Sequence, residues 1–252
     1  MIDTVRSALL GVNDPCERTG KMIKGIVFDK DGTLFDFNAT WGALTGKIIA
    51  TETGHDPARM AALADVMGYD LSAGVFRQGS IVIAETVSVV ADAMLPLLPD
   101  VAKSDLMIRM KDATKDAVQV EPVPLRAVLA QLRDMNLTLG VATNDAEAPA
   151  LANLAHVIDM FAFIAGFDSG FGGKPEAGQL LAFCEATDLD PADCVMVGDS
   201  LHDLHAGRAA GMACVGVLTG PAPRKELAPH ADVVLNTIAE LPAWIAARNV
   251  AV

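Results

Sequence analysis

The segment KGIVFDKDGTL, residues 24–34, decides both the fold and the chemistry of this chain. Its first part, Lys24–Phe28, is a run of β-branched and aromatic residues that is typical of a buried parallel strand. Asp29 then lies at the carboxyl end of that strand, where open α/β sheets bind their ligands. Asp31 follows two residues later, and Gly32 permits a sharp turn. Because two carboxylates this close can divide the roles of nucleophile and proton carrier, the segment predicts covalent catalysis at the edge of a parallel sheet.

Two further segments carry groups that suit a phosphate. Thr143 and Asn144 end the apolar strand predicted over Leu137–Ala142, and a hydroxyl and a backbone N–H at a strand end can hydrogen-bond phosphate oxygens. Taken alone, a Thr-Asn turn that caps the next helix is the commoner explanation. Lys174 lies in the loop GGKP, residues 172–175, before a predicted helix. A mobile positive charge there suits both a phosphate and a nucleophilic carboxylate.

A second pair of carboxylates predicts a metal site. Asp199 and Asp203 follow the apolar run Cys194–Val197 and are four residues apart, so they lie on one face of the first turn of a helix. Like charges at this spacing repel each other unless a cation lies between them or they accept N–H groups. Hard oxygen ligands without a nearby thiolate favour Mg²⁺. A zinc site with His202 and His205 is the weaker alternative, because carboxylates outnumber imidazoles here and no Cys is adjacent.

Taken together, these segments resemble the four motifs of the haloacid dehalogenase superfamily, and within it the phosphoglycolate-phosphatase-like group. The resemblance extends from about Lys24 over nearly all of the remaining chain, and it is carried by FDKDGTL at Phe28–Leu34, VATN at Val141–Asn144, GGKP at Gly172–Pro175 and VGDSLHD at Val197–Asp203. It implies that Asp29 is the nucleophile that becomes an aspartyl-phosphate and that Asp31 is the general acid and base. It also implies that Thr143, beside Asn144, binds the phosphoryl group.

The resemblance further implies how charge is balanced in the site. Lys174 would steady the charge on the nucleophile and the phosphate. Mg²⁺ would be bound by the side chains of Asp29 and Asp199 and by the backbone carbonyl of Asp31, while Asp203 would act through a water molecule or orient the other ligands. The chain departs from the group in two places. Lys30 stands between the two aspartates, where an apolar residue is usual, and Asp36-Phe37 replaces the commoner Asp-Ser.

The order of predicted elements indicates an α/β fold with a parallel, Rossmann-like sheet and helices on both faces. Strands are predicted at Lys24–Phe28, Leu137–Ala142, Phe161–Ala165, Cys194–Val197, Ala213–Val217 and Asp232–Leu235. Helices are predicted at Pro124–Met135, Ala146–His156, Glu176–Thr187 and Ile238–Arg248. Residues 37–120 have helical periodicity and are far longer than a crossover requires. We therefore expect an all-helical cap at 37–120, a catalytic core at 22–36 and 121–252, and an N-terminal extension at 1–21, with Met22 as an alternative start.

The cap is expected to select the substrate, because the core motifs handle only the phosphate. Arg77 lies beside Gly79 in the segment VFRQGS, before a long helix predicted at Ile81–Leu95. Its guanidinium suits a carboxylate or a second anion on the substrate, although a solvated loop arginine is the commoner case. Trp41 is interpreted as part of the cap core and not as a stacking platform.

Composition narrows the class of protein further. The chain has 252 residues, a formal net charge of −13 and four cysteines without metal spacing. So acidic a chain argues against binding to nucleic acid or to an anionic membrane. The cysteines are expected to be buried free thiols in a reducing cytoplasm. No apolar run approaches the length of a membrane helix.

We therefore expect a cytoplasmic, Mg²⁺-dependent phosphatase, a monomer or homodimer, that acts on a small phosphorylated metabolite. Phosphoglycolate is the substrate that the resemblance suggests. A sugar phosphomutase of the same fold remains open, because it would use the same motifs. A haloacid dehalogenase is disfavoured by Asp31 and Asp199, for which it has no use. A non-catalytic binding or regulatory protein on this scaffold is disfavoured by the intact set of charged residues.

Overall fold

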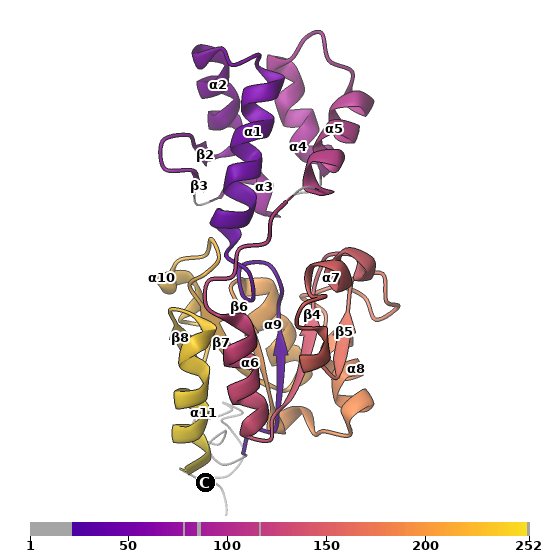
Figure 1. Ribbon diagram of the computed structural model, residues 1–252, viewed down its shortest axis with the longest axis vertical. Coiled ribbons are helices and arrows are strands. Elements are labelled where there is room, and N and C mark those ends of the chain that lie inside the picture. Colours follow the sequence, from indigo (N-terminus) through magenta and orange to yellow (C-terminus); the bar gives the residue numbers. More distant parts are fainter. Residues whose placement is uncertain (1–21, 78, 85–86, 116, 251–252) are drawn as a thin grey trace, which may run out of the picture.

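The computed structural model describes residues 22–77, 79–84, 87–115 and 117–250 (Figure 1). The N-terminal extension expected at 1–21 lies outside these residues. Among the described helices, none is long and apolar enough to cross a membrane. Cys184, Cys194 and Cys214 are free thiols buried in the protein, as expected, while Cys16 lies outside the described residues.

A six-stranded sheet forms the centre of the larger part of the molecule (Figure 1). Its strand order is β5-β4-β1-β6-β7-β8, and all neighbouring strands run parallel. All six strands that the sequence predicts are present, most of them one or two residues shorter than expected. Their bounds are β1 Gly25–Phe28, β4 Thr138–Ala142, β5 Phe163–Ala165, β6 Cys194–Gly198, β7 Ala213–Val217 and β8 Val233–Leu235.

Helices cover both faces of this sheet, because its inner strands are apolar on both sides. Ile26 and Phe28 of β1 belong to a cluster with Leu129 of α6 and Ile245 of α11, whereas Val27 packs on the other face with residues of α8 and α9. Burial on both faces explains the uninterrupted apolar runs in the sequence. The helices of this part are α6 Leu125–Asp134, α7 Glu147–Asn153, α8 Gly178–Thr187, α9 Leu201–Ala210, α10 Arg224–Leu227 and α11 Leu241–Val250, with single turns η4 Ile158–Met160, η5 Pro191–Asp193 and η6 Ile238–Glu240.

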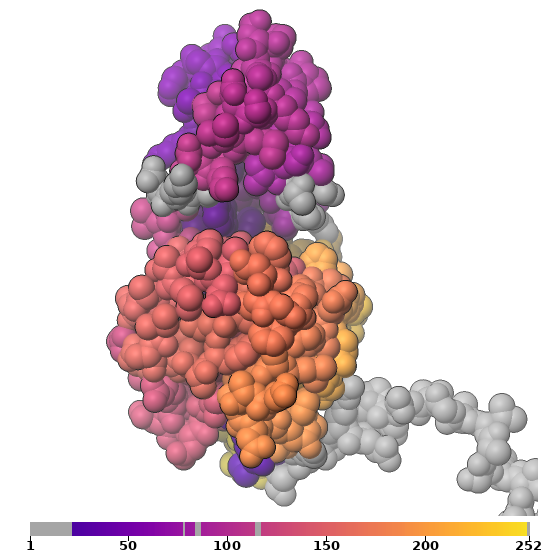
Figure 2. Space-filling view, turned by 90° about the vertical axis from the view of Figure 1, so that its right-hand side faces the viewer, coloured from indigo at the N-terminus to yellow at the C-terminus, as the bar shows by residue number. Residues whose placement is uncertain are grey.

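A second, mainly helical part is inserted between β1 and α6. Figure 2 shows it as a lobe of its own above the sheet part. It has its own apolar cluster, which includes Ile49, Leu63 and Met94. Its elements are η2 Asn38–Gly42, α1 Ala43–Glu52, α2 Pro57–Met67, α3 Ile81–Ala84, α4 Val87–Met94, η3 Leu95–Leu97 and α5 Lys103–Lys115.

The inserted part also holds one feature that the sequence does not predict. Strands β2, Tyr69–Asp70, and β3, Val75–Phe76, form a two-stranded antiparallel sheet beside the helices. Strands this short carry no periodic signal. They are held by tertiary contacts, such as the edge-to-face packing of Tyr69 on Phe76 with ring centroids 5.4 Å apart.

Candidate active site

The carboxyl ends of three central strands bring the predicted motifs together. Phe28, the last residue of β1, pairs with Val141 of β4 on one side and with Val197 of β6 on the other. The residues that follow these strands therefore meet at one edge of the sheet. Seven of the eight residues that the sequence predicts for the site line one cavity of about 700 Å³ there: Asp29, Asp31, Thr143, Asn144, Lys174, Asp199 and Asp203.

Lys174 joins two of the carboxylates. Its Nζ lies 2.5 Å from Asp29 Oδ1 and 2.6 Å from Asp203 Oδ1, and all three side chains are buried. Burial by itself lowers the pKa of Lys174, but the Coulombic attraction of Asp203 and Asp29 outweighs it and raises the pKa above its ordinary value. The ammonium therefore stays charged beside the predicted nucleophile.

Both carboxylate oxygens of Asp203 already accept hydrogen bonds from other protein groups. Its Oδ2 accepts hydrogen bonds from the backbone N–H of Ser200 at 3.0 Å and from the Ser200 hydroxyl at 2.7 Å, which caps helix α9. Its Oδ1 is taken by Lys174. Asp199, by contrast, accepts only a long side-chain hydrogen bond among the described residues, from the Thr33 hydroxyl at 3.4 Å. Of the two carboxylates, Asp199 is therefore the better placed to bind a ligand from the cavity.

Two glycines leave room for Asp199. A Cβ atom at Gly220 would lie 1.7 Å from Asp199 Oδ2, and a Cβ atom at Gly32 would lie 2.4 Å from the same oxygen. Gly32 also has a φ of +79°, which L-residues with side chains rarely adopt. The sequence pattern indicates Gly32 as a turn residue, but nothing in it indicates that Gly220, in the loop after β7, approaches the site.

The carboxylates present fit a hard divalent cation. One ligand oxygen each of Asp29, Asp199 and Asp203 lies within 4.8 Å of the others. Burial raises the pKa of Asp199 well above its ordinary value, and the nearby charges of Asp203 and Asp29 add to the shift. The ammonium of Lys174 balances part of this negative charge, and a cation with oxygen ligands would balance more.

The predicted phosphate-binding residues are held by a network of their own. The Thr143 hydroxyl accepts a hydrogen bond from the backbone N–H of Asp145 at 3.1 Å. Asn144 exchanges two hydrogen bonds with the backbone of Lys174, at 2.9 and 2.8 Å, and so ties the two loops together. Gln179, a buried residue that the sequence analysis missed, donates to the carbonyl oxygen of Thr143 at 3.0 Å. Its position in the first turn of α8 gave no sign of this contact.

The opposite wall of the cavity comes partly from the inserted part. The inserted part contributes Phe37, Gly79 and Ile83. The sheet part adds His202, Glu226 and the loop Pro221–Pro223. Of these residues, only His202 was considered from the sequence, as a possible zinc ligand. The loop after β7 could have been identified, because it follows a strand that ends at the same edge of the sheet.

Arg77 is the predicted site residue that is not among those lining the cavity. Its Nη1 lies 2.7 Å from Asp65 Oδ1 on α2, and both side chains are at least half exposed.

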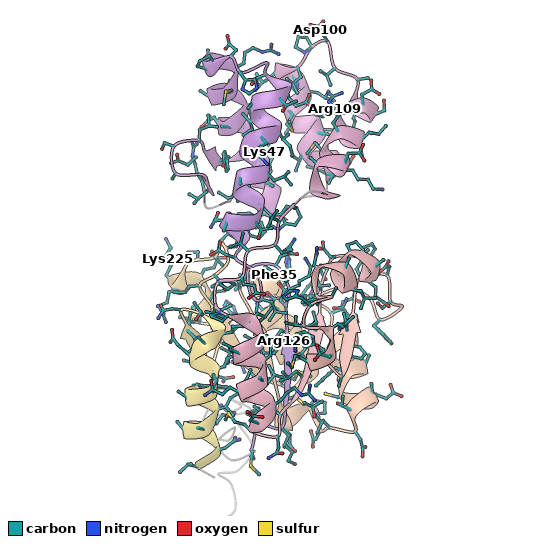
Figure 3. The ribbon with its side chains drawn as sticks, viewed as in Figure 1. Phe35, Lys47, Asp100, Arg109, Arg126 and Lys225 are labelled. Atoms are coloured by element: carbon teal, nitrogen blue, oxygen red, sulfur yellow. The ribbon has the colours of Figure 1, made fainter. Side chains whose placement is uncertain are left out.

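In Figure 3, Phe35 lies at the junction of the two parts, whereas Lys47 and Arg109 lie on helices of the inserted part. Arg109 makes a two-pronged ion pair with Glu52, with both contacts at 2.7 Å.

The pKa of the predicted nucleophile leads to a test of the site's electrostatics. Burial raises the pKa of Asp29 from 3.8 to about 7, opposed by Lys174 and aided by Asp203. The folded protein thus holds this proton more tightly than the unfolded chain, so Asp29 lowers stability as the pH rises through the window from 3.8 to about 7. In chelator, the melting temperature of Asp29→Asn should exceed that of the wild type increasingly across this window. An unchanged difference between pH 4 and pH 8 would contradict this electrostatic account.

Comparison with known proteins identifies the family. Residues 23–211 match the family described as haloacid dehalogenase-like hydrolases. The chain is 33% identical over 223 residues to a phosphoglycolate phosphatase of Chromobacterium violaceum, with 88% of this chain and 96% of that protein covered. The resemblance inferred from the four motifs is therefore confirmed.

Solved structures agree on the fold. A HAD family hydrolase of Deinococcus radiodurans with bound phosphate and sodium matches with a TM-score of 0.69 at 20% identity, over 91% of this chain and 97% of that one. A β-phosphoglucomutase of Clostridium difficile matches with a TM-score of 0.57 at 18% identity, over 90% and 97%. With the motifs gathered at one sheet edge and the family match over most of the sequence, the chain belongs to the haloacid dehalogenase-like hydrolases.

Proposed function

We propose that this hydrolase is a Mg²⁺-dependent phosphatase that cleaves a small phosphomonoester through an aspartyl-phosphate at Asp29. One observation carries the proposal: Asp29, at the end of β1, shares a cavity with Asp31 and is paired at 2.5 Å with the buried ammonium of Lys174. A carboxylate nucleophile, a second carboxylate for the proton and a fixed positive charge are the groups that phosphoryl transfer to a protein requires.

The reaction proceeds in two displacements at phosphorus. In the first, an oxygen of Asp29 forms a bond to phosphorus, the ester P–O bond breaks, and Asp31 gives its proton to the leaving oxygen. In the second, Asp31 takes a proton from a water molecule whose oxygen attacks phosphorus. The bond to Asp29 then breaks, which releases phosphate and restores the Asp29 carboxylate and the protonated form of Asp31. Thr143 and Lys174 hydrogen-bond the phosphoryl oxygens while charge moves onto them.

Mg²⁺, when bound, neutralises charge on the phosphoryl group and the nucleophile. Asp29, Asp199 and the backbone carbonyl of Asp31 would hold it. Asp203 would orient the site, a role supported by the saturation of both of its oxygens by Lys174 and Ser200.

The inserted part is proposed to act as a cap over the site. It contributes Phe37, Gly79 and Ile83 to the cavity wall, and Figure 2 shows the surface hollowed between the two lobes. We keep the bounds 37–120 for this cap, with the core at 22–36 and 121–252. The protein would work in the cytoplasm, as a monomer or homodimer. Phosphoglycolate, named by the relative from Chromobacterium violaceum, is the first substrate to test.

A panel of phosphorylated metabolites tests the proposed function. With Mg²⁺ present, the protein should release inorganic phosphate from 4-nitrophenyl phosphate and from at least one small metabolite, ranked by kcat/KM. No release from any ester would leave the non-catalytic binding or regulatory protein as the explanation. The second candidate, a sugar phosphomutase, is supported by the structural match to a β-phosphoglucomutase. Conversion of a hexose phosphate into its isomer without phosphate release would favour it.

Arg77 remains a prediction for substrate choice. An exposed ion pair such as that with Asp65 is worth about 0–1 kcal/mol, so Arg77 can exchange Asp65 for a substrate anion at little cost. A charged hydrogen bond is worth about 1.5–3 kcal/mol, or roughly a tenfold to hundredfold change. Arg77→Ala should lower kcat/KM for a substrate with a second anion by about that factor relative to 4-nitrophenyl phosphate. Asp65→Asn, which leaves Arg77 in place, is the matched control and should cause no such loss. An equal loss on both esters, or none, would remove Arg77 from the site.

A further inference from the structure

Lys30, the residue between the two aspartates of the first motif, carries its positive charge in the interior of the protein. Its exposed fraction is 0%. Its Nζ lies 2.5 Å from Asp31 Oδ2, 3.0 Å from Asp145 Oδ2 and 3.3 Å from Asn153 Oδ1. An ammonium has three N–H donors, so these three oxygens satisfy it completely.

Such a group is not a substitute for the apolar residue that is usual at this place. Burying an ammonium is costly unless it is paired and hydrogen-bonded. Burial lowers the pKa of Lys30, but the attraction of Asp31 and Asp145 outweighs it, so the group stays charged. Its partners come from the loop after β4 and from α7, far from Lys30 in sequence. Lys30 therefore makes polar contacts that an apolar side chain at this position could not make.

The contacts of Lys30 fix the carboxylate of Asp31 from one side. The other side is held by Trp41 in η2, whose indole N–H donates to Asp31 Oδ1 at 3.3 Å. Each oxygen of Asp31 thus has its own donor, and rotation of the carboxylate would break at least one of these contacts. Through Asp145, whose backbone N–H donates to the Thr143 hydroxyl at 3.1 Å, Lys30 also ties Asp31 to the phosphate-binding loop.

We propose that Lys30 is a positioning residue, which holds the Asp31 carboxylate at the point where the leaving oxygen is protonated and in register with the phosphate-binding loop. The inference rests on the proposed function, because it assigns Asp31 to proton transfer. A general acid must lie within hydrogen-bond reach of the atom that it protonates. A displacement of about 1 Å can cost about a hundredfold in rate.

A purely structural role for Lys30 makes a different prediction, so the two can be separated by the choice of leaving group. The 4-nitrophenolate ion leaves without a proton, whereas the alkoxide of benzyl phosphate needs one. Loss of a well-placed acid therefore slows the second ester selectively. The parameter to compare is kcat/KM, because it covers only the steps up to the aspartyl-phosphate. General damage to the fold or the phosphate site lowers both values together.

The test compares Lys30→Met with the wild type on 4-nitrophenyl phosphate and benzyl phosphate, both with Mg²⁺. The ratio of kcat/KM for benzyl phosphate to that for 4-nitrophenyl phosphate should fall by about 10- to 100-fold. General acid catalysis contributes about 10²–10⁴-fold in rate, and a displaced acid loses part of that contribution. Lys24→Met is the matched control. Lys24 is half exposed, pairs with Asp193 at 2.6 Å beside the opposite end of β1, and should leave the ratio unchanged.

A second variant keeps the test possible if Lys30→Met does not fold. Lys30→Met leaves Asp31 and Asp145 without the charge between them, and Lys30→Met/Asp145→Asn removes one of these carboxylates. Thermal unfolding identifies which variant is folded, and the same fall in the ratio is expected of it. An unchanged ratio in a folded variant would overturn the positioning role while the phosphatase stands. Wild-type protein inactive on both esters would instead contradict the proposed function, and the inference with it.

Discussion

The Asp29→Asn variant is expected to fold normally and to have lost nearly all phosphatase activity. The amide has almost the same shape as the carboxylate, and the ammonium of Lys174 keeps Asp203 as a partner at 2.6 Å. An amide cannot serve as the nucleophile, so no aspartyl-phosphate can form. Loss of a covalent nucleophile costs about 10⁶-fold in kcat in a serine protease, so we expect a loss of several orders of magnitude here. Phosphate release from 4-nitrophenyl phosphate with Mg²⁺ measures the effect, and thermal unfolding measures the fold.

Asp134→Asn is the matched control for this experiment. Asp134 is an exposed carboxylate at the end of α6, remote from the cavity, so its variant should keep the activity of the wild type. If Asp29→Asn retained more than a few per cent of wild-type activity, the assignment of the nucleophile would be wrong. Asp31 or a directly activated water molecule would then have to perform the attack.

The second large effect is expected from removal of the metal. A chelator should abolish activity, and Mg²⁺ should restore it, because Asp29, Asp199 and Asp203 bring oxygens to within 4.8 Å of one another and a cation balances their charge. Asp199→Ala should weaken Mg²⁺ affinity more than Asp203→Ala. Within the described residues, the side-chain contact of Asp199 with Thr33 is long, at 3.4 Å, whereas both oxygens of Asp203 are held closely by Lys174 and Ser200. Loss of an orienting residue costs about 10- to 100-fold in metal affinity, and loss of a direct ligand should cost more.

A titration of activity against Mg²⁺ measures these affinities for the wild type and both variants. Restoration with Zn²⁺ in place of Mg²⁺ is the control for the kind of metal. Full activity in chelator, or restoration by Zn²⁺ alone, would contradict the magnesium assignment. A larger loss for Asp203→Ala would exchange the roles of the two carboxylates.

Much of the fold could be predicted, because the relevant signals are local. The strands of the sheet are buried on both faces and therefore read as apolar runs, such as Gly25–Phe28. Their carboxyl ends meet at one edge, so the residues that follow them could be placed together from the sequence alone. This is how Asp29, Thr143 and Asp199 were expected to share a site, and they line one cavity.

The remainder depends on contacts between residues far apart in sequence. The pairing of Lys30 with Asn153 spans 123 positions, and neither residue carries a sign of it. The hydrogen bond from Gln179 to Thr143 spans 36 positions and starts from the first turn of α8, where the helical pattern does not reveal it. Arg77 pairs with the nearby carboxylate of Asp65 and is not among the residues that line the cavity, so its role in substrate choice stays a prediction. Such competition among charged neighbours is settled by geometry that a sequence pattern does not contain.

The stereochemical course at phosphorus tests the central claim most directly. A phosphorothioate monoester made chiral at phosphorus with two oxygen isotopes is hydrolysed in water that carries the third isotope, and the configuration of the released chiral thiophosphate is determined. Two in-line displacements, the first by Asp29 and the second by water, predict retention of configuration. Inversion would mean a single direct attack by water and would contradict the aspartyl-phosphate at Asp29.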